Sequence, residues 1–265
     1  MKKIFNFIFI TQDDPFYIRG FFREFFSIYS DLREIKTVVI QNPMGKRSTW
    51  ALAKQMYALY GLIDFFRMGL RYVKIKILCR LSRFYKKSEW LGLRQLCRSH
   101  DIEVLDQNDI HEAEFLAELR RRDLDLIVSV AAPTIFRKGL IDLPRLGCIN
   151  IHHAPLPRYR GMMPNFWQLY HGEKSVGITI HKINPKIDEG EIILQKQVPI
   201  KAGESLDELI RRTKQLGAHF MVKAIEMVRN GRVKFKENRP EEGSYFSFPT
   251  REDVKKFRAM GHRLL

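Results

Sequence analysis

The chain has few cysteines, and their arrangement indicates neither a cross-link nor a metal site. Its 265 residues include three, Cys79, Cys97 and Cys148, which are odd in number, widely spaced and placed in apolar or helical surroundings. Neither a disulfide framework nor a zinc site fits that pattern. We therefore expect a reducing, intracellular compartment.

Long hydrophobic runs are also missing. No stretch of the sequence approaches the roughly 20 apolar residues that a membrane-spanning helix needs. Two lysines precede the apolar run Ile4–Ile10, as in a signal peptide, but Asn6 interrupts the run and Gln12-Asp13-Asp14 follows it without a small-residue cleavage site. We expect residues 3–11 to form a buried strand and the protein to be cytoplasmic.

Acidic side chains are scarce relative to basic ones. The chain has 30 Asp and Glu against 46 Lys and Arg, which gives a formal net charge of +16. A basic balance of this size favours an anionic partner, which is nucleic acid, an anionic membrane surface or a polyanionic small molecule such as a nucleotide. Charge alone does not choose among these three.

The order of predicted elements indicates an α/β fold. A strand at 3–11, a helix at 16–29 and a strand at 37–41 have the spacing of parallel strands joined by right-handed crossovers. The apolar run Leu124–Val130 is typical of a strand buried on both faces. No Gly-x-Gly-x-x-Gly follows the first strand, so a bound dinucleotide is not expected. We predict a Rossmann-like, mostly parallel sheet flanked by helices.

Two segments depart from that pattern. Residues 1–230 are predicted to form the main domain and 231–265 a short C-terminal extension, while 48–87 is an inserted segment. Between Lys54 and Lys87 the only acidic residue is Asp64. The nine basic residues there are Lys54, Arg67, Arg71, Lys74, Lys76, Arg80, Arg83, Lys86 and Lys87. Several of them are three or four residues apart, which predicts a basic amphipathic helix or helix pair.

The apolar side of this predicted helix allows three interpretations. Its members are Leu62, Phe66, Leu70, Val73, Ile77, Leu81 and Phe84. In the first interpretation the apolar side packs on the domain and the charged side faces water. In the second, residues 54–87 contact an anionic membrane surface or a lipid-linked substrate. In the third, they bind nucleic acid.

The most informative stretch begins at residue 148. The residues that lead into it, Arg145–Ile151, are typical of a short apolar strand, and side chains alternate along a strand, so Asn150 and His152 share one face. Three prolines and a glycine follow, so this polar pair lies where a strand ends and a stiff loop begins. A catalytic pair needs that combination of access and rigidity.

A carboxylate further along suits the same site. Residues 177–183 alternate as a strand does, and Asp188 follows in a loop bounded by Pro185 and Gly190. A carboxylate beside an imidazole raises its basicity and fixes its tautomer. Asn150, His152 and Asp188 therefore form a candidate set of amide donor, base and orienting group. We interpret His181, on the preceding strand, as a structural histidine.

These residues resemble the formyltransferase family that uses 10-formyltetrahydrofolate. The elements that carry the resemblance are Asn150-x-His152, Leu156-Pro-x-Tyr-Arg-Gly161, Pro164 with Trp167, Gly177-x-Thr179 and Asp188-x-Gly190. Their order and spacing agree over roughly residues 95–230. The family includes glycinamide-ribonucleotide, methionyl-tRNA and nucleotide-sugar N-formyltransferases and formyltetrahydrofolate hydrolase.

The resemblance implies roles for individual residues. Asn150 would donate to the oxyanion of the tetrahedral intermediate, and His152 would donate to it as an imidazolium or take the proton of the amine, directly or through water. Asp188 would hold His152 and accept from the incoming amine. The 10-formyltetrahydrofolate co-substrate would lie against Ala131, Pro133, Ile135, Phe136 and Ile187. No metal is expected.

Three residues near the motif are candidates for acceptor binding. The family more often has proline at the position of His153, so this residue either alters the loop or adds a second imidazole to the site. Arg158 and Arg160 either brace the loop or contact a phosphate, since a guanidinium serves both purposes.

The acceptor predicted from these features is a small amine, a nucleotide- or lipid-linked amino sugar whose phosphates suit the positive charge. Methionyl-tRNA enzymes of the family carry a sizeable C-terminal domain, and only 35 residues (265 minus 230) follow Asn230 here. Glycinamide-ribonucleotide enzymes are shorter and lack an insertion like 48–87. Hydrolysis of the formylfolate and a non-catalytic protein that binds nucleic acid or membrane are the remaining alternatives.

Overall fold

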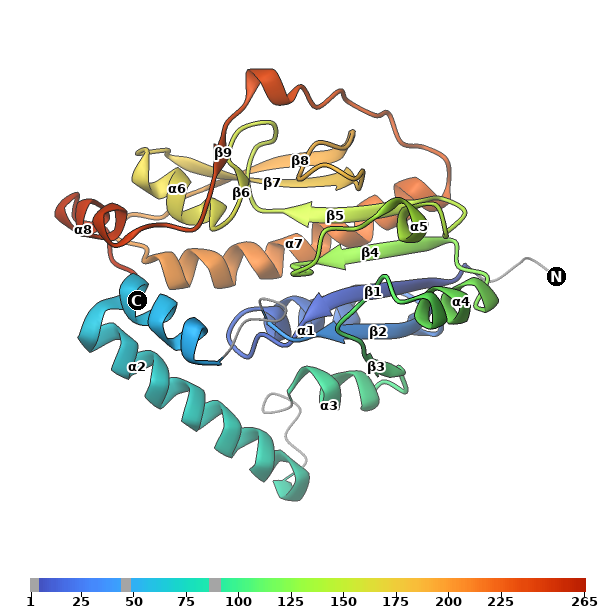
Figure 1. Ribbon diagram of the computed structural model, residues 1–265, viewed down its shortest axis with the longest axis horizontal. Helices are drawn as coiled ribbons and strands as arrows, with labels where there is room; N and C mark the ends of the chain where they lie inside the picture. The colour runs from blue at the N-terminus through green and yellow to red at the C-terminus, as the bar shows by residue number, and fades with distance from the viewer. Residues whose placement is uncertain (1–4, 44–48, 86–91) are drawn as a thin grey trace.

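The computed structural model describes residues 5–43, 49–85 and 92–265. Among these residues, seven strands form one sheet in the order β3-β2-β1-β4-β5-β7-β8 (Figure 1). The strands are β1 (Phe7–Gln12), β2 (Ile35–Gln41), β3 (Val104–Asp106), β4 (Leu126–Val130), β5 (Cys148–His152), β7 (Ser175–Lys182) and β8 (Ile192–Pro199). Strands β3 to β5 pair in parallel, whereas β7 is antiparallel to both β5 and β8. The predicted mostly parallel α/β fold is confirmed.

Helices cover both faces of the sheet. The helical elements in the described residues are α1 (Ile18–Ile28), α2 (Thr49–Tyr85), α3 (Leu93–Arg98), α4 (Ala113–Arg121), α5 (Lys138–Ile141), α6 (Pro164–Tyr170), α7 (Leu206–Arg229) and α8 (Arg251–Ala259), with 3-10 turns at Leu32–Glu34 and Pro240–Glu242. On β1, Phe7 and Phe9 join the core cluster that includes α1 and α7, whereas Ile8 and Ile10 join the cluster that includes α4 and α5. Strand β1 is therefore buried on both sides, as its unbroken apolar sequence requires.

Two helices begin in different ways. Ser205 and Glu208 form a capping box at the start of α7. The carboxylate of Asp14 accepts from the N–H groups of Phe16 and Tyr17, and α1 begins after them, at Ile18. Asp14 therefore stabilises the turn that precedes α1.

The inserted segment is the helix α2, as predicted, and it is a helix pair. Its backbone leaves the helical conformation at Gly61, where φ is 67° and ψ is −179°. Figure 1 shows the longer part as a rod that projects away from the sheet. The interpretation that its apolar side packs on the domain is wrong: Phe66 is 62% exposed and Leu70 73% exposed. Lys86 and Lys87 lie outside the described residues, as do the side chains of Arg83 and Phe84.

The C-terminal segment 231–265 runs back over the main domain. Two short strands, β6 (Arg160–Gly161) and β9 (Tyr245–Phe246), pair in parallel beside the main sheet. Phe257 of α8 stacks on Phe166 of α6, with ring centroids 4.6 Å apart. The division into 1–230 and 231–265 stays a prediction. No helix among the described residues has the length and apolar character needed to cross a membrane.

Candidate active site

The candidate site lies at the carboxyl ends of β4 and β5, beside the change from parallel to antiparallel pairing in the sheet. A cavity of about 640 Å³ is found there, within the size range of small-molecule sites. Its walls come from the loops after β4 and β5, the loop between β7 and β8, α7, and the C-terminal segment. Asn150, His152 and Asp188 all line it. The structure thus brings together the three residues predicted to be catalytic.

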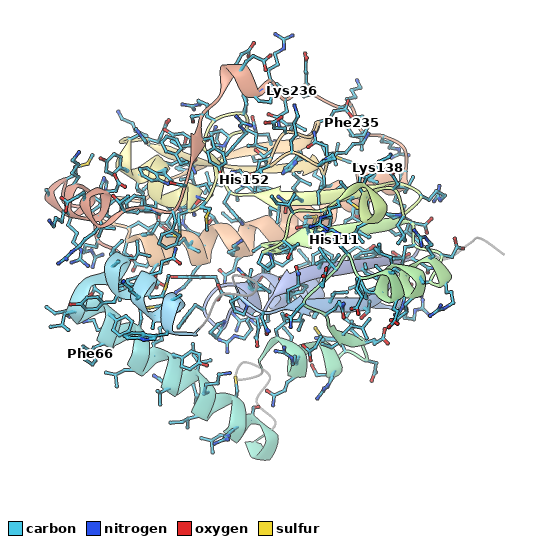
Figure 2. The ribbon with its side chains drawn as sticks, viewed as in Figure 1. Phe66, His111, Lys138, His152, Phe235 and Lys236 are labelled. Atoms are coloured by element: carbon cyan, nitrogen blue, oxygen red, sulfur yellow. The ribbon has the colours of Figure 1, made fainter. Side chains whose placement is uncertain are left out.

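His152, labelled in Figure 2, is held by the loop that follows its own strand. Its Nε2 lies 2.8 Å from the carbonyl oxygen of Tyr159, and a carbonyl only accepts, so Nε2 carries a proton and donates it. The other ring nitrogen, Nδ1, lies 3.5 Å from Oδ2 of Asp188. His152 can therefore take a proton at Nδ1, where a carboxylate stabilises the cation that forms.

A second imidazole, His181, completes the arrangement. Its Nδ1 lies 2.7 Å from the carbonyl oxygen of Lys182, so Nδ1 carries the proton and Nε2 accepts. Asn150 Nδ2 donates to that Nε2 at 3.2 Å, and Asp188 Oδ1 lies 3.6 Å from it. His181 thus fixes the Asn150 amide, a contact that the interpretation of His181 as a structural residue did not include.

The charge states of His152 and Asp188 follow from their burial and from these contacts. Burial is the largest influence on His152 and lowers its pKa, although Asp188 and the Tyr159 carbonyl act in the opposite direction. Burial alone would raise the pKa of Asp188, but His152, His181 and the N–H of Gly161 together lower it below its usual range. At neutral pH the site therefore holds a neutral imidazole beside a carboxylate, which is the state a general base requires.

The backbone around the site is strained. Ala131, Met163 and Asp188 line the cavity with φ values of 54°, 53° and 54°, and Tyr159, which holds His152, has a φ of 61°. Residues other than glycine seldom adopt this left-handed region, and such strain concentrates at functional sites. Four strained residues in the loops around this cavity support its assignment as the site.

Gly190 determines how closely the loop of Asp188 packs on the sheet. A Cβ at this position would lie 1.8 Å from the carbonyl oxygen of Lys182, which no side chain tolerates. The adjoining carbonyl groups of Asp188 and Gly190 accept from the Asn238 amide at 2.9 and 3.0 Å. A glycine and the C-terminal segment therefore hold the carboxylate in place.

The residues predicted to contact the folate lie together. Ala131, Pro133, Ile135 and Phe136 follow β4, and Ile187 comes from the loop between β7 and β8; all five line the cavity. This apolar wall suits a flat aromatic ligand. Their contact with the co-substrate stays a prediction.

His153 and Lys214 form a part of the cavity wall that departs from the expected pattern. Both ring nitrogens of His153 are buried, and neither has a hydrogen-bond partner among the described residues. Burial places its pKa well below the usual histidine value, and Lys214 and His152 lower it further. Burial also lowers the pKa of Lys214, to about 8, against the opposing charge of Asp14. Sequence reasoning missed Lys214 because nothing in the helix pattern of α7 shows which lysine turns toward the cavity.

Arg158 and Arg160 lie outside the cavity lining. Arg158 donates to Glu173 at 2.8 Å, and Arg160 pairs with Glu189, the residue after Asp188. These contacts suit the interpretation of both as loop braces, and their contact with a phosphate stays a prediction.

Two other features of the described residues bear on where a ligand could bind. No group of three or more His, Cys, Asp or Glu side chains within this part of the chain could hold a metal ion. A second cavity, of about 730 Å³, lies between the loop after β1, α2 and α3. Among the described residues its lining includes Cys79, Asp13 and Asp14 but no histidine, and its Arg94 is paired with Asp13 and Asp106.

Comparison with known proteins places the motifs in one family. The profile of the family described as formyl transferase matches residues 83–225, which is 143 of 265 residues and more than half of the chain. A methionyl-tRNA formyltransferase of Pelobacter propionicus is 34% identical over 142 residues, which cover 54% of this chain and 44% of that relative. The chain thus spans about half the length of the curated relatives it matches.

Solved structures share the fold at lower identity. A phosphoribosylglycinamide formyltransferase of Anaplasma phagocytophilum superposes with a TM-score of 0.59 at 16% identity and covers 92% of this chain and 99% of that one. A sugar N-formyltransferase of Shewanella has a TM-score of 0.56 at 18% identity and covers 97% and 89% of the two chains. At this level of identity the similarity shows a shared fold.

Proposed function

The chain belongs to the formyl transferase family, and we propose that it transfers the formyl group of 10-formyltetrahydrofolate to the amine of a small acceptor, a nucleotide- or lipid-linked amino sugar. The observation that carries this proposal is the convergence of Asn150, His152 and Asp188 on one cavity, with the Nδ1 of a neutral imidazole 3.5 Å from the carboxylate. That arrangement suits an acyl transfer between an amide donor and an amine.

His152 acts as the base in the proposed mechanism. Its Nε2–H remains bonded to the Tyr159 carbonyl, so the proton of the attacking amine moves to Nδ1. Asp188 stabilises the resulting imidazolium through its Oδ2. His152 then returns the proton to the departing nitrogen, which leaves the site ready for a second cycle.

Asn150 stabilises the negative charge that develops on the formyl oxygen. One N–H of its amide is directed at Nε2 of His181, which fixes the plane of the group, and we assign the other N–H to the oxyanion. A preorganised donor of this kind is worth about 3–4 kcal/mol of transition-state stabilisation.

The folate co-substrate supplies the formyl group, and the apolar residues of the cavity would hold its ring system. Ala131, Pro133 and Phe136 of the loop after β4 and Ile187 of the loop between β7 and β8 line the cavity together. The left-handed conformation of Ala131, with φ of 54°, turns that loop sharply at the end of β4.

We assign the acceptor to the part of the cavity lined by Lys214 and the C-terminal segment. Lys214 provides a cation for an acceptor phosphate, and Tyr245 and Phe248 of the C-terminal segment provide aromatic rings for a sugar or a base. Methionyl-tRNA is the second candidate acceptor, because the curated relatives are named as methionyl-tRNA formyltransferases. A cytoplasmic location suits all of these acceptors and stays a prediction.

The test is release of tetrahydrofolate from 10-formyltetrahydrofolate, first without an acceptor and then with nucleotide-linked amino sugars, lipid-linked amino sugars and methionyl-tRNA. We expect release that depends on an amino sugar, with formation of a formamido product. Release at the same rate without any acceptor would identify a hydrolase. Release only with methionyl-tRNA would replace the proposed acceptor by the second candidate.

Replacement of Lys214 by methionine should weaken binding of a phosphorylated acceptor. Its pKa of about 8 means that the wild-type lysine is charged at pH 7 and loses its charge as the pH rises through 8. We expect the acceptor KM of the wild type to rise between pH 7 and pH 9, and the Lys214→Met variant to show a KM about tenfold higher at pH 7 with little change to pH 9. Lys223→Met, an exposed lysine on the same helix, is the matched control, and equal KM values in the two variants would contradict the assignment.

A further inference from the structure

The outward side of α2 has a composition that the proposed reaction does not explain. Seven large apolar residues lie along it, from Leu62 at 59% exposure to Leu81 at 36%. They are Leu62, Ile63, Phe66, Leu70, Val73, Ile77 and Leu81, here called the α2 stripe. Their spacing of three or four residues places them on one side of a single helix. Soluble surfaces rarely gather this much apolar area without a binding role.

The opposite side of α2 is fixed to the body of the protein. Asp64 pairs with Arg258 of α8 at 3.0 Å, and Arg71 pairs with Asp207 of α7 at 2.8 Å. Met68, which lies between Asp64 and Arg71 in the sequence, is buried. Because ion pairs to two different helices set the rotation of α2, the α2 stripe cannot turn inward without breaking them.

Basic residues border the α2 stripe. At 100° per residue, Arg67 and Lys74 lie along one edge of the stripe, and Lys76 and Arg80 lie along the other. All four are exposed, and Lys76 and Arg80 also line the cavity between α2 and α3. The single carboxylate between Lys54 and Tyr85, that of Asp64, is shared between Arg258 at 3.0 Å and Arg67 at 3.1 Å. The outward side of α2 is therefore apolar along its centre and positively charged on both edges.

We infer that α2 is a membrane-docking helix that lies in the plane of an anionic phospholipid surface, with the α2 stripe among the acyl chains and the four bordering cations at the lipid phosphates. Interfacial helices have this distribution, since long basic side chains reach back to the headgroups while the apolar centre is buried. The part of α2 after Gly61 spans about 36 Å at 1.5 Å per residue, long enough to engage several lipids.

Charge complementarity favours this partner over the alternatives. A second copy docked through the same face would bring the basic edges of both helices together, and like charges in contact disfavour association. Nucleic acid binds proteins chiefly through cations that meet its phosphates, whereas here the centre of the face is aliphatic and aromatic. Only an anionic surface with an apolar layer beneath it matches both parts of the face. This inference does not depend on which acceptor the enzyme uses.

Flotation of the full chain with lipid vesicles tests the inference. We expect binding to vesicles in which phosphatidylglycerol replaces a third of the phosphatidylcholine to be at least about tenfold stronger than binding to phosphatidylcholine alone, because each basic residue near the surface strengthens binding roughly fivefold. Binding should weaken at high salt. The double variant Lys74→Gln/Lys76→Gln should lose about tenfold or more, while Lys138→Gln/Lys236→Gln, with the same change in net charge, should bind like the wild type.

Variants in which apolar residues of the α2 stripe become glutamine distinguish insertion of α2 into the lipid from simple charge attraction. Phe66→Gln/Leu70→Gln/Ile77→Gln should lose roughly a hundredfold in vesicle binding, since three large side chains no longer enter the lipid. These residues are more than half exposed, so the fold should persist, which circular dichroism checks. Phe66→Gln alone should bind more weakly than Phe235→Gln; Figure 2 shows Phe235 on the far side of the molecule from Phe66.

Three outcomes would overturn the inference. The first is equal binding to neutral and anionic vesicles, or no binding to either. The second is unchanged vesicle binding by the triple variant. The third is sedimentation or gel-shift data in which the triple variant abolishes self-association or RNA binding while vesicles are not bound, which would assign α2 to a second copy or to nucleic acid.

Discussion

A His152→Gln variant is expected to lose roughly a thousandfold in kcat, the range typical of a lost general base. The reason is the position of Nδ1, which is 3.5 Å from Asp188 and is left to accept a proton because Nε2 donates to the Tyr159 carbonyl. A glutamine amide can still donate to that carbonyl but has no basic nitrogen. The measurement is formation of tetrahydrofolate with the acceptor at saturation.

The control for this variant is His219→Gln, which removes an imidazole of similar chemistry far from the cavity. His219 is half exposed and pairs with Glu24 at 2.7 Å on the surface, so its loss should leave kcat within about twofold, as a lone surface ion pair contributes little. A His152→Gln enzyme that retained near-wild-type kcat would exclude His152 as the base and require another group to take the proton.

The sequence was sufficient to predict the sheet and the convergence of Asn150, His152 and Asp188 on one cavity because local rules place these residues. Alternation along a strand places Asn150 and His152 on one face, and the glycine and proline signals around Asp188 place it in a loop. What could not be predicted is the pairing register. His181 reaches Asn150 only because β7 runs antiparallel to β5 and pairs these two residues, and strand neighbours are not encoded in either strand alone.

The inserted helix α2 shows a second limit of prediction from the sequence. Its apolar and basic periodicity correctly predicts a helix or helix pair, but periodicity cannot say whether an apolar side meets protein or solvent. In α2 both sides carry apolar residues: Met68 is buried at 8% exposure, while Leu70, two residues later, is 73% exposed. The ion pairs of Asp64 and Arg71 with distant helices decide the orientation, and these tertiary contacts are beyond any local pattern.

Asp188→Asn tests the proposed role of Asp188, which is to stabilise the imidazolium that forms on His152. The variant keeps the size of the side chain and removes the charge that faces His152 at 3.5 Å and His181 at 3.6 Å. We expect kcat to fall by at least about a hundredfold, because the imidazolium formed at His152 loses its counter-charge. Glu189→Gln is the matched control: it removes the neighbouring carboxylate, which pairs with Arg160 outside the cavity.

The pH profile distinguishes this role from a merely structural one. Burial lowers the pKa of His152 and Asp188 raises it, so the wild-type activity should fall on the acid side only below the ordinary histidine range. Without the Asp188 charge, the pKa of His152 should drop further, and the acid limb of kcat/KM in Asp188→Asn should move to lower pH. A structural defect would lower the rate at every pH and leave the limb in place. An acid limb that moved to higher pH would show that the titrating group is not an imidazole stabilised by Asp188.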